Sequence, residues 1–416
     1  MIPEKVFQQI LILGESWEVF AVDYDEAQSK VFIRVRETAR LWPAEHCPKC
    51  NAQSVAGYDH VPERHWRHLN VCQLQSAVVC ALPRGRCRAC EAVFQIKPPW
   101  EGRSKHFTQE FEGFALVLAR EMPVSKAGEI LGENDQRLWR MLFAHVEAAH
   151  EQLSMEEVVW VGADEMNRRK GHNYVTVFVD LQAKRVLFAT EGKDSTTWEA
   201  FANALLEHNG HPKAVTQVAI DMSPAYRKGV AANFANACVS FDKFHVVGHV
   251  VGAVDEVRRA ERAHPDRGEL LEKARWLFLK NPENWTEKEG ARWEELVAEN
   301  LATGLAYQMR LVFQDIYKLG SEKLARKKFQ NWCEWVEQAA GQAGKLLEPM
   351  LKTARMVREH LDGILGHWKE GLTTAYLEGL NSLFSATKRK ARGYRSTEHL
   401  IAMLYFVAGK LSIPCY

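Results

Sequence analysis

The feature that most constrains the fold is an ordered series of strand-like and helix-like runs between residues 158 and 242. Three runs with strand character and tight connections come first, as in an antiparallel meander. Two helical patterns then alternate with two short apolar runs. The expected strands span 158–164, 173–180, 184–192, 214–221 and 237–242, and the expected helices span 195–208 and 223–234. The predicted element order is therefore β-β-β-α-β-α-β.

Two of these runs end in an aspartate. The apolar run Val215–Ile220 is followed directly by Asp221, and the first run ends at Asp164. A charge at the tip of a buried strand is costly unless something pairs with it. The element order, followed by a late helix, is that of an RNase H-like domain, where the first and fourth strands are neighbours. By that analogy the two aspartates converge, and Glu378 on the late helix supplies a third carboxylate.

Three carboxylates suit the cleavage of a phosphodiester. Two divalent ions about 3.5–4 Å apart stabilise the attacking and leaving oxygens of such a reaction. Magnesium prefers hard carboxylate oxygens. We therefore expect Asp164, Asp221 and Glu378 to be catalytic and to bind two magnesium or manganese ions. An aspartate at a strand end is also common without any such role.

Three other acidic residues compete for this role. Glu165 is expected to point away from Asp164 if the strand continues. Asp180 ends a strand that runs in the opposite direction, so its tip lies at the other end of the sheet. Asp242 ends a strand parallel to the fourth and stays a candidate auxiliary residue.

The late helix carries a one-sided set of charges. Between Glu378 and Glu398 there is no acidic residue, and the basic residues are Lys388, Arg389, Lys390, Arg392 and Arg395. Helical spacing places Asn381, Ser382, Ser385, Arg389 and Arg392 near the face of Glu378. We expect Lys388, Arg389 and Arg392 to contact DNA phosphates. The alternative is an ordinary solvated helix face.

The chain has nine cysteines, and four of them form two C-x-x-C pairs. Cys47, Cys50, Cys87 and Cys90 have the spacing of a four-thiolate structural zinc site, and such pairs favour a reducing compartment over a disulfide framework. Two unrelated pairs of reduced thiols are the alternative. Between the pairs, Cys72 and Cys80 are expected to be buried. His60, His65 and His68 could also bind zinc, but the segment "ERHWRHLN" favours a basic, aromatic surface for phosphates.

A helix-turn-helix is predicted after the cysteine pairs. Helical patterns at Val124–Leu131 and from about Asn134 flank a short Gly132-Glu133 turn. Base-edge contacts would come from the start of the second helix, where Gln136, Arg137 and Arg140 lie. Generic helical hairpins give the same pattern, but the neighbouring cysteine pairs and basic stretches favour DNA binding.

The totals set limits on the class of protein. A chain of 416 residues is expected to form two to four domains. The formal net charge is +1, so only local charge can indicate a polyanionic partner. No apolar run approaches the roughly 18 residues of a membrane span, and the first residues lack the pattern of a signal peptide. We therefore expect no membrane partner.

Taken together, the motifs resemble bacterial insertion-sequence transposases of the ISL-three family. The likeness rests on the segments "CPKC", "CRAC", "ERHWRHLN", "VSKAGEILG", "GADE", "AIDMSPAY", "FDKFHVV" and "YLEGLNSLFSATKRKARGY". The resemblance implies a DDE transposase with Asp164, Asp221 and Glu378 as its metal-binding triad. It also implies that "DKFH" places Asp242 and His245 beside the scissile phosphate.

The same resemblance implies a biological setting. The N-terminal domains would recognise the terminal inverted repeats in double-stranded DNA, and the enzyme would hydrolyse the phosphodiester at each end and join the 3′ ends to target DNA. At least a homodimer is expected on DNA, because two ends must be held together. The location would be the bacterial cytoplasm. The alternatives are a catalytically inactive, transposase-derived DNA-binding regulator and a Holliday-junction nuclease of the same fold.

The expected fold class is a multidomain α+β protein with an RNase H-like α/β catalytic domain interrupted by an all-helical insertion. The expected domains are an N-terminal β-hairpin region (1–45), a zinc-binding domain (46–100), a helix-turn-helix domain (105–150), the first catalytic part (155–250), the insertion (251–365) and a second catalytic part with the Glu-bearing helix (366–416). The insertion is rich in tryptophan, and one exposed tryptophan could stack on a displaced base.

Overall fold

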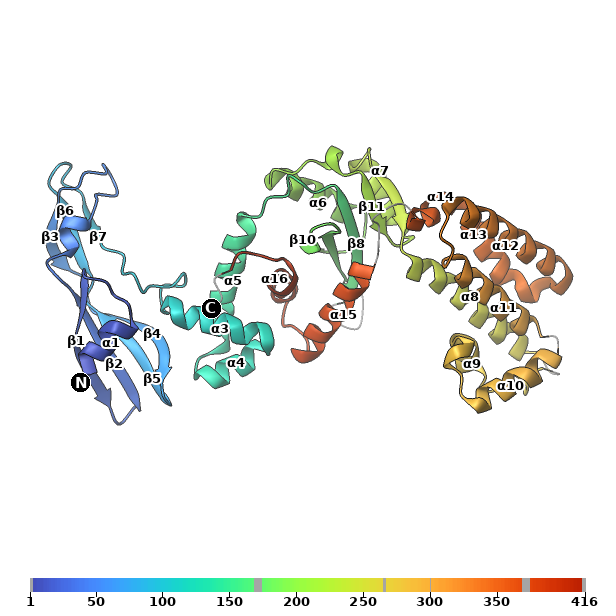
Figure 1. Cartoon of the computed structure of the whole chain (residues 1–416), viewed down its shortest axis with the longest axis horizontal. Helices are drawn as coiled ribbons and strands as arrows, with labels where there is room; N and C mark the ends of the chain where they lie inside the picture. Colours follow the sequence, from blue (N-terminus) through green and yellow to red (C-terminus); the bar gives the residue numbers. More distant parts are fainter. Residues whose placement is uncertain (1–2, 168–173, 265–266, 300, 369–374, 414–416) are drawn as a thin grey trace. The chain divides into compact units, whose positions relative to one another are not determined.

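The structure is a computed structural model that describes residues 3–167, 174–264, 267–299, 301–368 and 375–413. The chain forms two compact units. The first combines Met1–Leu153 with Ala386–Tyr416, and the second is Ser154–Ser385. Figure 1 shows their elements along the chain. Among the described residues, no helix is long and apolar enough to cross a bilayer.

A four-stranded sheet forms most of the N-terminal part of the first unit. Its strands are β1 (Trp17–Asp25), β2 (Lys30–Glu37), β4 (Arg64–Val71) and β5 (Leu74–Cys80), in the order β1-β2-β5-β4, and α1 (Pro3–Ile10) precedes them. Alternating residues of these strands bury a core that includes Ile33, Trp66 and Val78. Because β2 pairs with β5, this sheet crosses the division that we expected at residue 45.

A second, three-stranded sheet carries the cysteine pairs. It contains β3 (Val55–His60), β6 (Pro83–Cys87) and β7 (Val93–Gln95) in the order β3-β6-β7, all antiparallel. The short helix α2 (Leu41–Ala44) leads into it. The two sheets alternate along the chain, since β4 and β5 of the larger sheet lie between β3 and β6.

Three helices follow: α3 (Gln109–Glu121), α4 (Val124–Leu131) and α5 (Asp135–Glu151). Helix α4 ends at Gly132, whose φ of 64° is the left-handed conformation that glycine adopts readily. Asn134 then caps α5 by accepting a hydrogen bond from the backbone N–H of Gln136. The two predicted helices and the short turn between them are thus present, with Gly132 ending the first helix and Asn134 capping the second.

The last helix, α16 (Thr397–Ala408), packs on α5 in the first unit. The His399 ring meets Trp139 and Phe143 edge-on, at centroid distances of 4.5 and 5.1 Å. This differs from our expectation that all of 366–416 belongs to the catalytic part. Since α16 is apolar around most of its surface, its sequence indicates burial but not which element buries it.

The second unit contains a five-stranded mixed sheet. Its strands are β8 (Trp160–Asn167), β9 (Tyr174–Asp180), β10 (Arg185–Glu191), β11 (Gln217–Ile220) and β12 (Cys238–Phe241), in the order β10-β9-β8-β11-β12. The first three are antiparallel, and β11 is parallel to both β8 and β12. Helices α6 (Thr196–Glu207) and α7 (Pro224–Asn233) occupy the predicted connections. The predicted order of strands and helices is therefore correct.

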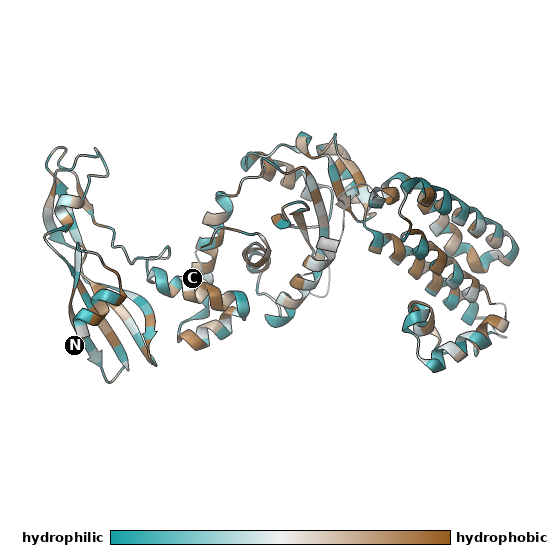
Figure 2. Ribbon diagram, in the orientation of Figure 1, coloured by the Kyte–Doolittle hydropathy of each residue, from teal (hydrophilic) through white to brown (hydrophobic). Residues whose placement is uncertain are grey.

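Helices fill the chain between β12 and the late helix. They are α8 (Lys243–Arg262), α9 (Arg275–Leu279), α10 (Glu287–Ala298), α11 (Ala302–Ile316), α12 (Glu322–Ala343), α13 (Glu348–Glu359) and α14 (Leu361–Ile364), followed by α15 (Ala375–Lys390). Figure 2 shows hydrophobic and hydrophilic residues alternating along them, as in helices that bury one side. Trp332 is buried, whereas Trp276 is 64% exposed.

Candidate active site and zinc centre

Strand pairing brings Asp164 and Asp221 to the same level of the sheet. Strands β8 and β11 are parallel, with Val218 opposite Val161 and Ala219 opposite Gly162. Continuing this register by two residues puts Asp221, which directly follows β11, level with Asp164. We had expected Asp164 to end its strand, but it does not. It lies within β8, which continues to Asn167 because β9 still pairs with it there.

Asp164 has neighbours from three chain segments. Its Oδ1 accepts a hydrogen bond of 2.7 Å from the backbone N–H of Glu165, and its Oδ2 accepts one from the side-chain amide of Asn381 on α15. The Nε2 of His245, on the first turn of α8, lies 3.9 Å from Asp164 Oδ1. Residues far apart in the sequence therefore gather around this carboxylate.

Asp221 and Asp242 both stand where a parallel strand gives way to a helix. Asp221 Oδ1 accepts a hydrogen bond of 2.9 Å from the backbone N–H of Ser223, just before α7. Asp242 is buried, and its Oδ1 accepts one of 2.8 Å from the backbone N–H of Phe244, which caps α8. Each carboxylate is thus oriented by a hydrogen bond from a backbone N–H group two residues later in the chain.

Glu165 shares the electrostatic environment of the two aspartates. Burial, and next the negative charge of Asp221, raise the pKa of Glu165 above its usual value, and Asp164 adds to the effect. Strand alternation gives Glu165 and Asp164 opposite faces, which is why the sequence led us to set it aside. Strand alternation does not account for the charges of Asp221 and Asp164, which act on Glu165 without direct contact. The only sequence signal was its position next to Asp164.

Tyr226 of α7 forms a buried wall near these carboxylates. Its hydroxyl lies 2.8 Å from Thr176 Oγ1 of β9, and its ring meets Trp198 edge-on at 5.7 Å. Burial raises the pKa of Tyr226, and the negative charges of Glu165, Asp221 and Asp164 raise it further. The phenol therefore stays neutral beside a group of carboxylates.

Asp180 lies at the other end of the sheet, as predicted. It pairs with Val161 at the start of β8, and its Oδ1 accepts hydrogen bonds of 2.9 Å from the backbone N–H groups of Gln182 and Ala183. Its role is to close the β9–β10 turn.

Glu378 lies within α15, but its side chain falls outside the described residues. Asn381, three residues later, contacts Asp164. Helix α15 ends at Lys390, and Arg392 adopts a φ of 54° before Gly393. The expectation that Arg392 continues the helix face of Glu378 is therefore wrong, whereas Arg389 is helical and exposed.

The four cysteine sulfurs form a compact group. All four Sγ atoms lie within 4.8 Å of one another, with 3.5 Å between Cys47 and Cys90 and 3.6 Å between Cys50 and Cys87. Zinc–sulfur bonds of about 2.3 Å in a tetrahedron separate the sulfurs by about 3.8 Å. The cluster therefore fits a closed structural zinc site. Within the described part of the chain, it is the one group of three or more Cys, His, Asp or Glu side chains placed to hold a metal ion.

The two cysteine turns have the same backbone design. In one, the N–H of Asn51 donates to the carbonyl of Cys47 at 2.8 Å, and in the other the N–H of Glu91 donates to that of Cys87 at 3.0 Å. Asn51 and Glu91 both adopt a left-handed φ, of 59° and 58°. Each C-x-x-C turn thus curls to aim two sulfurs at one point.

The histidines between the pairs have other partners. His60 Nε2 lies 2.8 Å from Glu37, and His68 is buried with its Nδ1 2.8 Å from Thr108 Oγ1. Trp66 is fully buried as well. The expected phosphate-binding surface at "ERHWRHLN" is therefore wrong for Trp66 and His68, which face the core on one side of strand β4, whereas His65 is exposed. Cys80 is buried as predicted, but Cys72 is exposed.

The three predicted base readers of α5 differ in availability. Gln136 and Arg140 are exposed. Arg137 pairs with Glu133 at 2.8 Å, and its guanidinium lies 4.8 Å from the centre of the Phe107 ring. Arg137 therefore holds the helix against the preceding loop, and Gln136 and Arg140 are the side chains left to reach outward.

Comparisons with known proteins place these features in one family. Two family models match: the one described as "Transposase", of the ISL3 type, over residues 161–404, and a "zinc-finger of transposase IS204/IS1001/IS1096/IS1165" over residues 43–90. Together they cover both the carboxylate site and the cysteine pairs.

Two curated relatives are similar over nearly their whole length. The transposase for insertion sequence element IS1001 of Bordetella parapertussis is 26% identical over 92% of this chain and 93% of its own. The transposase for IS1557 of Mycobacterium tuberculosis is 23% identical over 96% and 94%. The chain therefore belongs to the ISL3 family of DDE transposases.

Proposed function

We propose that the protein cuts the phosphodiester at the ends of an insertion sequence and joins the freed 3′ ends to target DNA. Asp164, Asp221 and Glu378 would bind two divalent cations, magnesium or manganese, in an RNase H-like catalytic domain interrupted by the helices α8–α14. When bound, such ions activate an oxygen nucleophile and stabilise the leaving oxygen. The donor set fits them, since carboxylate oxygens are their preferred ligands.

The observation that carries this proposal is the contact between α15 and β8. Asn381 donates to Asp164, and Glu378 precedes Asn381 by three residues on the same helix. Residues three apart lie on one helix face. Glu378 is therefore expected to approach the two aspartates, which the β8–β11 register already sets level.

Two further residues would act at the same edge. His245 lies within 3.9 Å of Asp164 and is 44% exposed, so its ring can reach a phosphate oxygen beside the metals. Asp242 would hold the start of α8, and with it His245, in place through its cap. Its role in this proposal is therefore to position rather than to react.

Recognition of the terminal inverted repeats falls to the first unit. Gln136 and Arg140 at the exposed start of α5 would contact base edges in the major groove, and Arg137 would orient the helix. Lys388, Arg389 and Arg392 would contact phosphates. Since two ends must be cut together, the active form on DNA would be a dimer or higher.

The test compares two aspartates of the same sheet. Asp221→Asn should reduce magnesium-dependent cleavage of end-labelled inverted-repeat DNA by at least about 10³-fold, because it removes a metal ligand while keeping the side-chain shape. Binding to the same DNA should change little. Asp180→Asn, at the opposite end of the sheet, is the matched control and should keep cleavage.

The outcomes separate enzyme from regulator. If wild-type protein binds the repeats but never cuts them with magnesium or manganese, the chain is a DNA-binding regulator. If the Asp221→Asn protein cuts as well as wild type, the assignment of the triad is wrong.

A further inference from the structure

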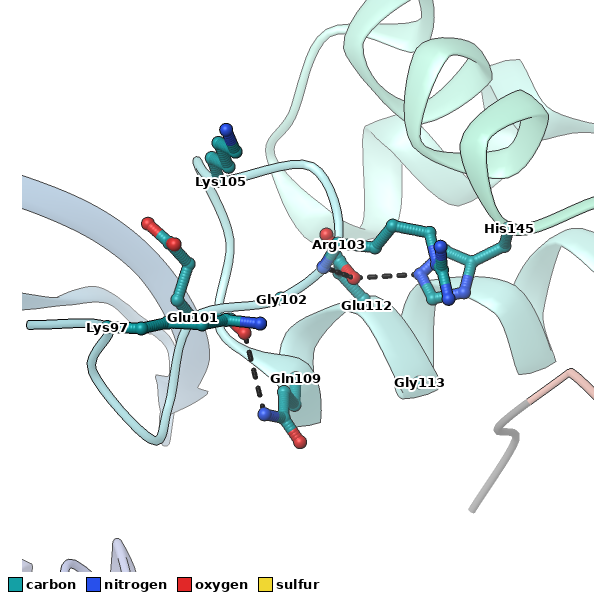
Figure 3. A pocket seen from close by; sticks show the side chains of 9 residues that line it. All are labelled: Lys97, Glu101, Gly102, Arg103, Lys105, Gln109, Glu112, Gly113 and His145. Atoms are coloured by element: carbon teal, nitrogen blue, oxygen red, sulfur yellow. Dashed lines mark hydrogen bonds and ion pairs between the residues drawn. The ribbon is translucent and has the colours of Figure 1, made fainter. Parts of the chain in front are cut away.

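A polar cavity of about 400 Å³ lies in the first unit beside the chain segment that leads from the zinc-binding sheet to α3. Figure 3 shows its lining. Lys97, Glu101, Arg103 and Lys105 come from that segment, Glu112 from α3 and His145 from α5. No predicted site residue contributes to it, so the cavity has no role in the function described so far.

Glu112 fixes the shape of this cavity. Its carboxylate accepts hydrogen bonds from the backbone N–H groups of Arg103 at 2.8 Å and Ser104 at 2.9 Å, from the Ser104 hydroxyl, and it lies 2.8 Å from His145 Nε2. Gly102 permits this close approach, because a Cβ there would collide with the carboxylate. The loop is thus held in place by hydrogen bonds to the buried Glu112 carboxylate, and both carboxylate oxygens have partners within the protein.

Glu101, the other acid in the wall, is also satisfied within the protein. It is 8% exposed, and its Oε1 accepts hydrogen bonds from Arg64 at 2.9 Å and from the Trp66 indole at 3.0 Å. Both acids of the cavity wall are therefore largely buried and paired within the protein.

The positive charges have the opposite arrangement. Lys97, Arg103 and Lys105 are exposed, and none of them forms an ion pair within the described ranges of the chain. Three exposed cations around one polar hollow repel one another unless an anion joins them. A loop held in this way gives the cavity a charge that suits an anionic ligand.

We propose that this cavity, defined by Lys97, Arg103 and Lys105, holds a backbone phosphate of the DNA duplex that the first unit binds. The inference rests on the proposed function, since it takes DNA as the partner. The segment 97–105 links the zinc-binding sheet to the helix-turn-helix, so a phosphate held there fixes the register of both on the duplex. Contacts of this kind position a protein on DNA without reading its sequence.

The architecture of the first unit favours a duplex over a small phosphate compound. The Arg67 guanidinium donates to the carbonyl of Leu131 at 2.9 Å, and the Gln75 amide donates to that of Gly132 at 3.0 Å. These bonds tie the four-stranded sheet to the turn of the helix-turn-helix. His145 of α5 also lines the cavity, so the cavity and the exposed start of α5 belong to parts of the first unit that are joined by direct contacts, and a duplex is expected at α5.

The experiment uses the full-length protein and two labelled duplexes, one with the terminal repeat and one scrambled. The triple variant Lys97→Ala/Arg103→Ala/Lys105→Ala should bind both duplexes more weakly. Because one phosphate contact is lost, the slope of log affinity against log salt should fall by about 1. Between about 50 and 200 mM salt, the ratio of wild-type to variant affinity should therefore shrink about threefold to fourfold.

The matched control is Arg40→Ala, which removes an exposed cation of the same unit that already pairs with Glu15. Its salt slope should equal that of wild type. Lys105→Arg within an otherwise wild-type chain should also keep the slope, since the charge remains. A triple variant with unchanged affinity and slope would overturn the proposal.

Two other results would also overturn it. A loss confined to the repeat duplex would mean that these residues contact bases. Binding of inorganic phosphate that the triple variant loses, with DNA affinity unchanged, would assign the cavity to a small phosphate ligand. Failure of wild type to prefer the repeat duplex over the scrambled one is a separate result, because it contradicts the proposed function and not the phosphate site.

Discussion

The cysteine cluster and the carboxylate group are built in opposite ways. The four thiolates come from two identical C-x-x-C turns that flank one small sheet, and each turn is shaped by its own backbone hydrogen bonds. The two aspartates come from β8 and the end of β11, and the Asn381 amide reaches Asp164 from α15, so these groups meet only when the second unit has folded. A site of the first kind is encoded locally, and one of the second kind is encoded by the topology of the sheet.

The largest effect that we expect from any single substitution is loss of the zinc ion, which would test whether the cysteine site is local. Cys87→Ser removes one of four ligands, so we expect the protein to lose its bound zinc and the β3-β6-β7 sheet to unfold locally. Structural zinc contributes about 10–16 kcal/mol in zinc-finger peptides, which is more than a small sheet can replace. Zinc content and limited proteolysis of the first unit would measure this.

The control is Cys72→Ser, an exposed thiol of the same region that is not in the cluster. It should keep both zinc and protease resistance. The thermal transition of the second unit should be unchanged in both variants. If Cys87→Ser also destabilised the second unit, the cysteine cluster would not be the independent, local site that the comparison requires.

A smaller effect is expected from Asn381→Ala, which tests whether topology alone assembles the carboxylates. Removing the amide frees Asp164 Oδ2 from α15. Loss of a residue that orients a metal ligand typically costs about 10–100-fold in metal affinity or activity. We expect a loss of this size in magnesium-dependent cleavage and a higher magnesium requirement, with unchanged binding to repeat DNA.

The exposed neighbour Leu383 provides the control, because Leu383→Ala changes the same helix on the side turned away from Asn381. It should keep full activity. An Asn381→Ala protein with wild-type magnesium dependence would show that the contact between α15 and β8 does not organise the site.

The same contrast explains what the sequence could predict. The cysteine pairs and the strand and helix order of 158–242 follow from short-range spacing and periodicity, and both are correct. The neighbouring positions of Asp164 and Asp221 followed once strand order was assumed, and the register supports that placement. These predictions needed either local rules or one assumption about topology.

Other features depend on which surfaces meet, and periodicity does not specify that. Helix α16 is apolar on nearly all sides, and only the structure shows that α5 buries it. Trp66 and His68 have the composition of a basic, aromatic surface, but both side chains lie on the side of their strand that faces the core. Glu165 was set aside on strand alternation, although the charge of Asp221 reaches it.

The smallest expected effect concerns two glutamates with opposite pKa shifts. Burial alone would raise the pKa of Glu112, but hydrogen bonds from His145 and Ser104 outweigh it and hold that pKa below its usual value. For Glu165, burial and the charge of Asp221 act in the same direction and raise its pKa. Donors from the protein satisfy the first carboxylate, whereas for the second the opposing charges of Lys193 and His245 do not outweigh burial and the neighbouring aspartates.

Unfolding measured against pH for each unit would test this difference. A lowered folded pKa gives stability that is present above the unfolded value, about 4.3, and is lost as pH falls through the folded pKa. Glu112→Gln should therefore cost the first unit about 1–3 kcal/mol of stability at neutral pH, and the difference from wild type should close in acid.

A raised folded pKa has the opposite effect on stability, because the ionised form is penalised as pH rises through that pKa. Glu165→Gln should therefore stabilise the second unit at neutral pH in the absence of divalent ions, and added magnesium should reduce that gain, since cations near Asp221 offset the repulsion. If both substitutions destabilised their units at neutral pH, Glu165 would be a carboxylate satisfied like Glu112, and the second site would need no cation to balance its charge.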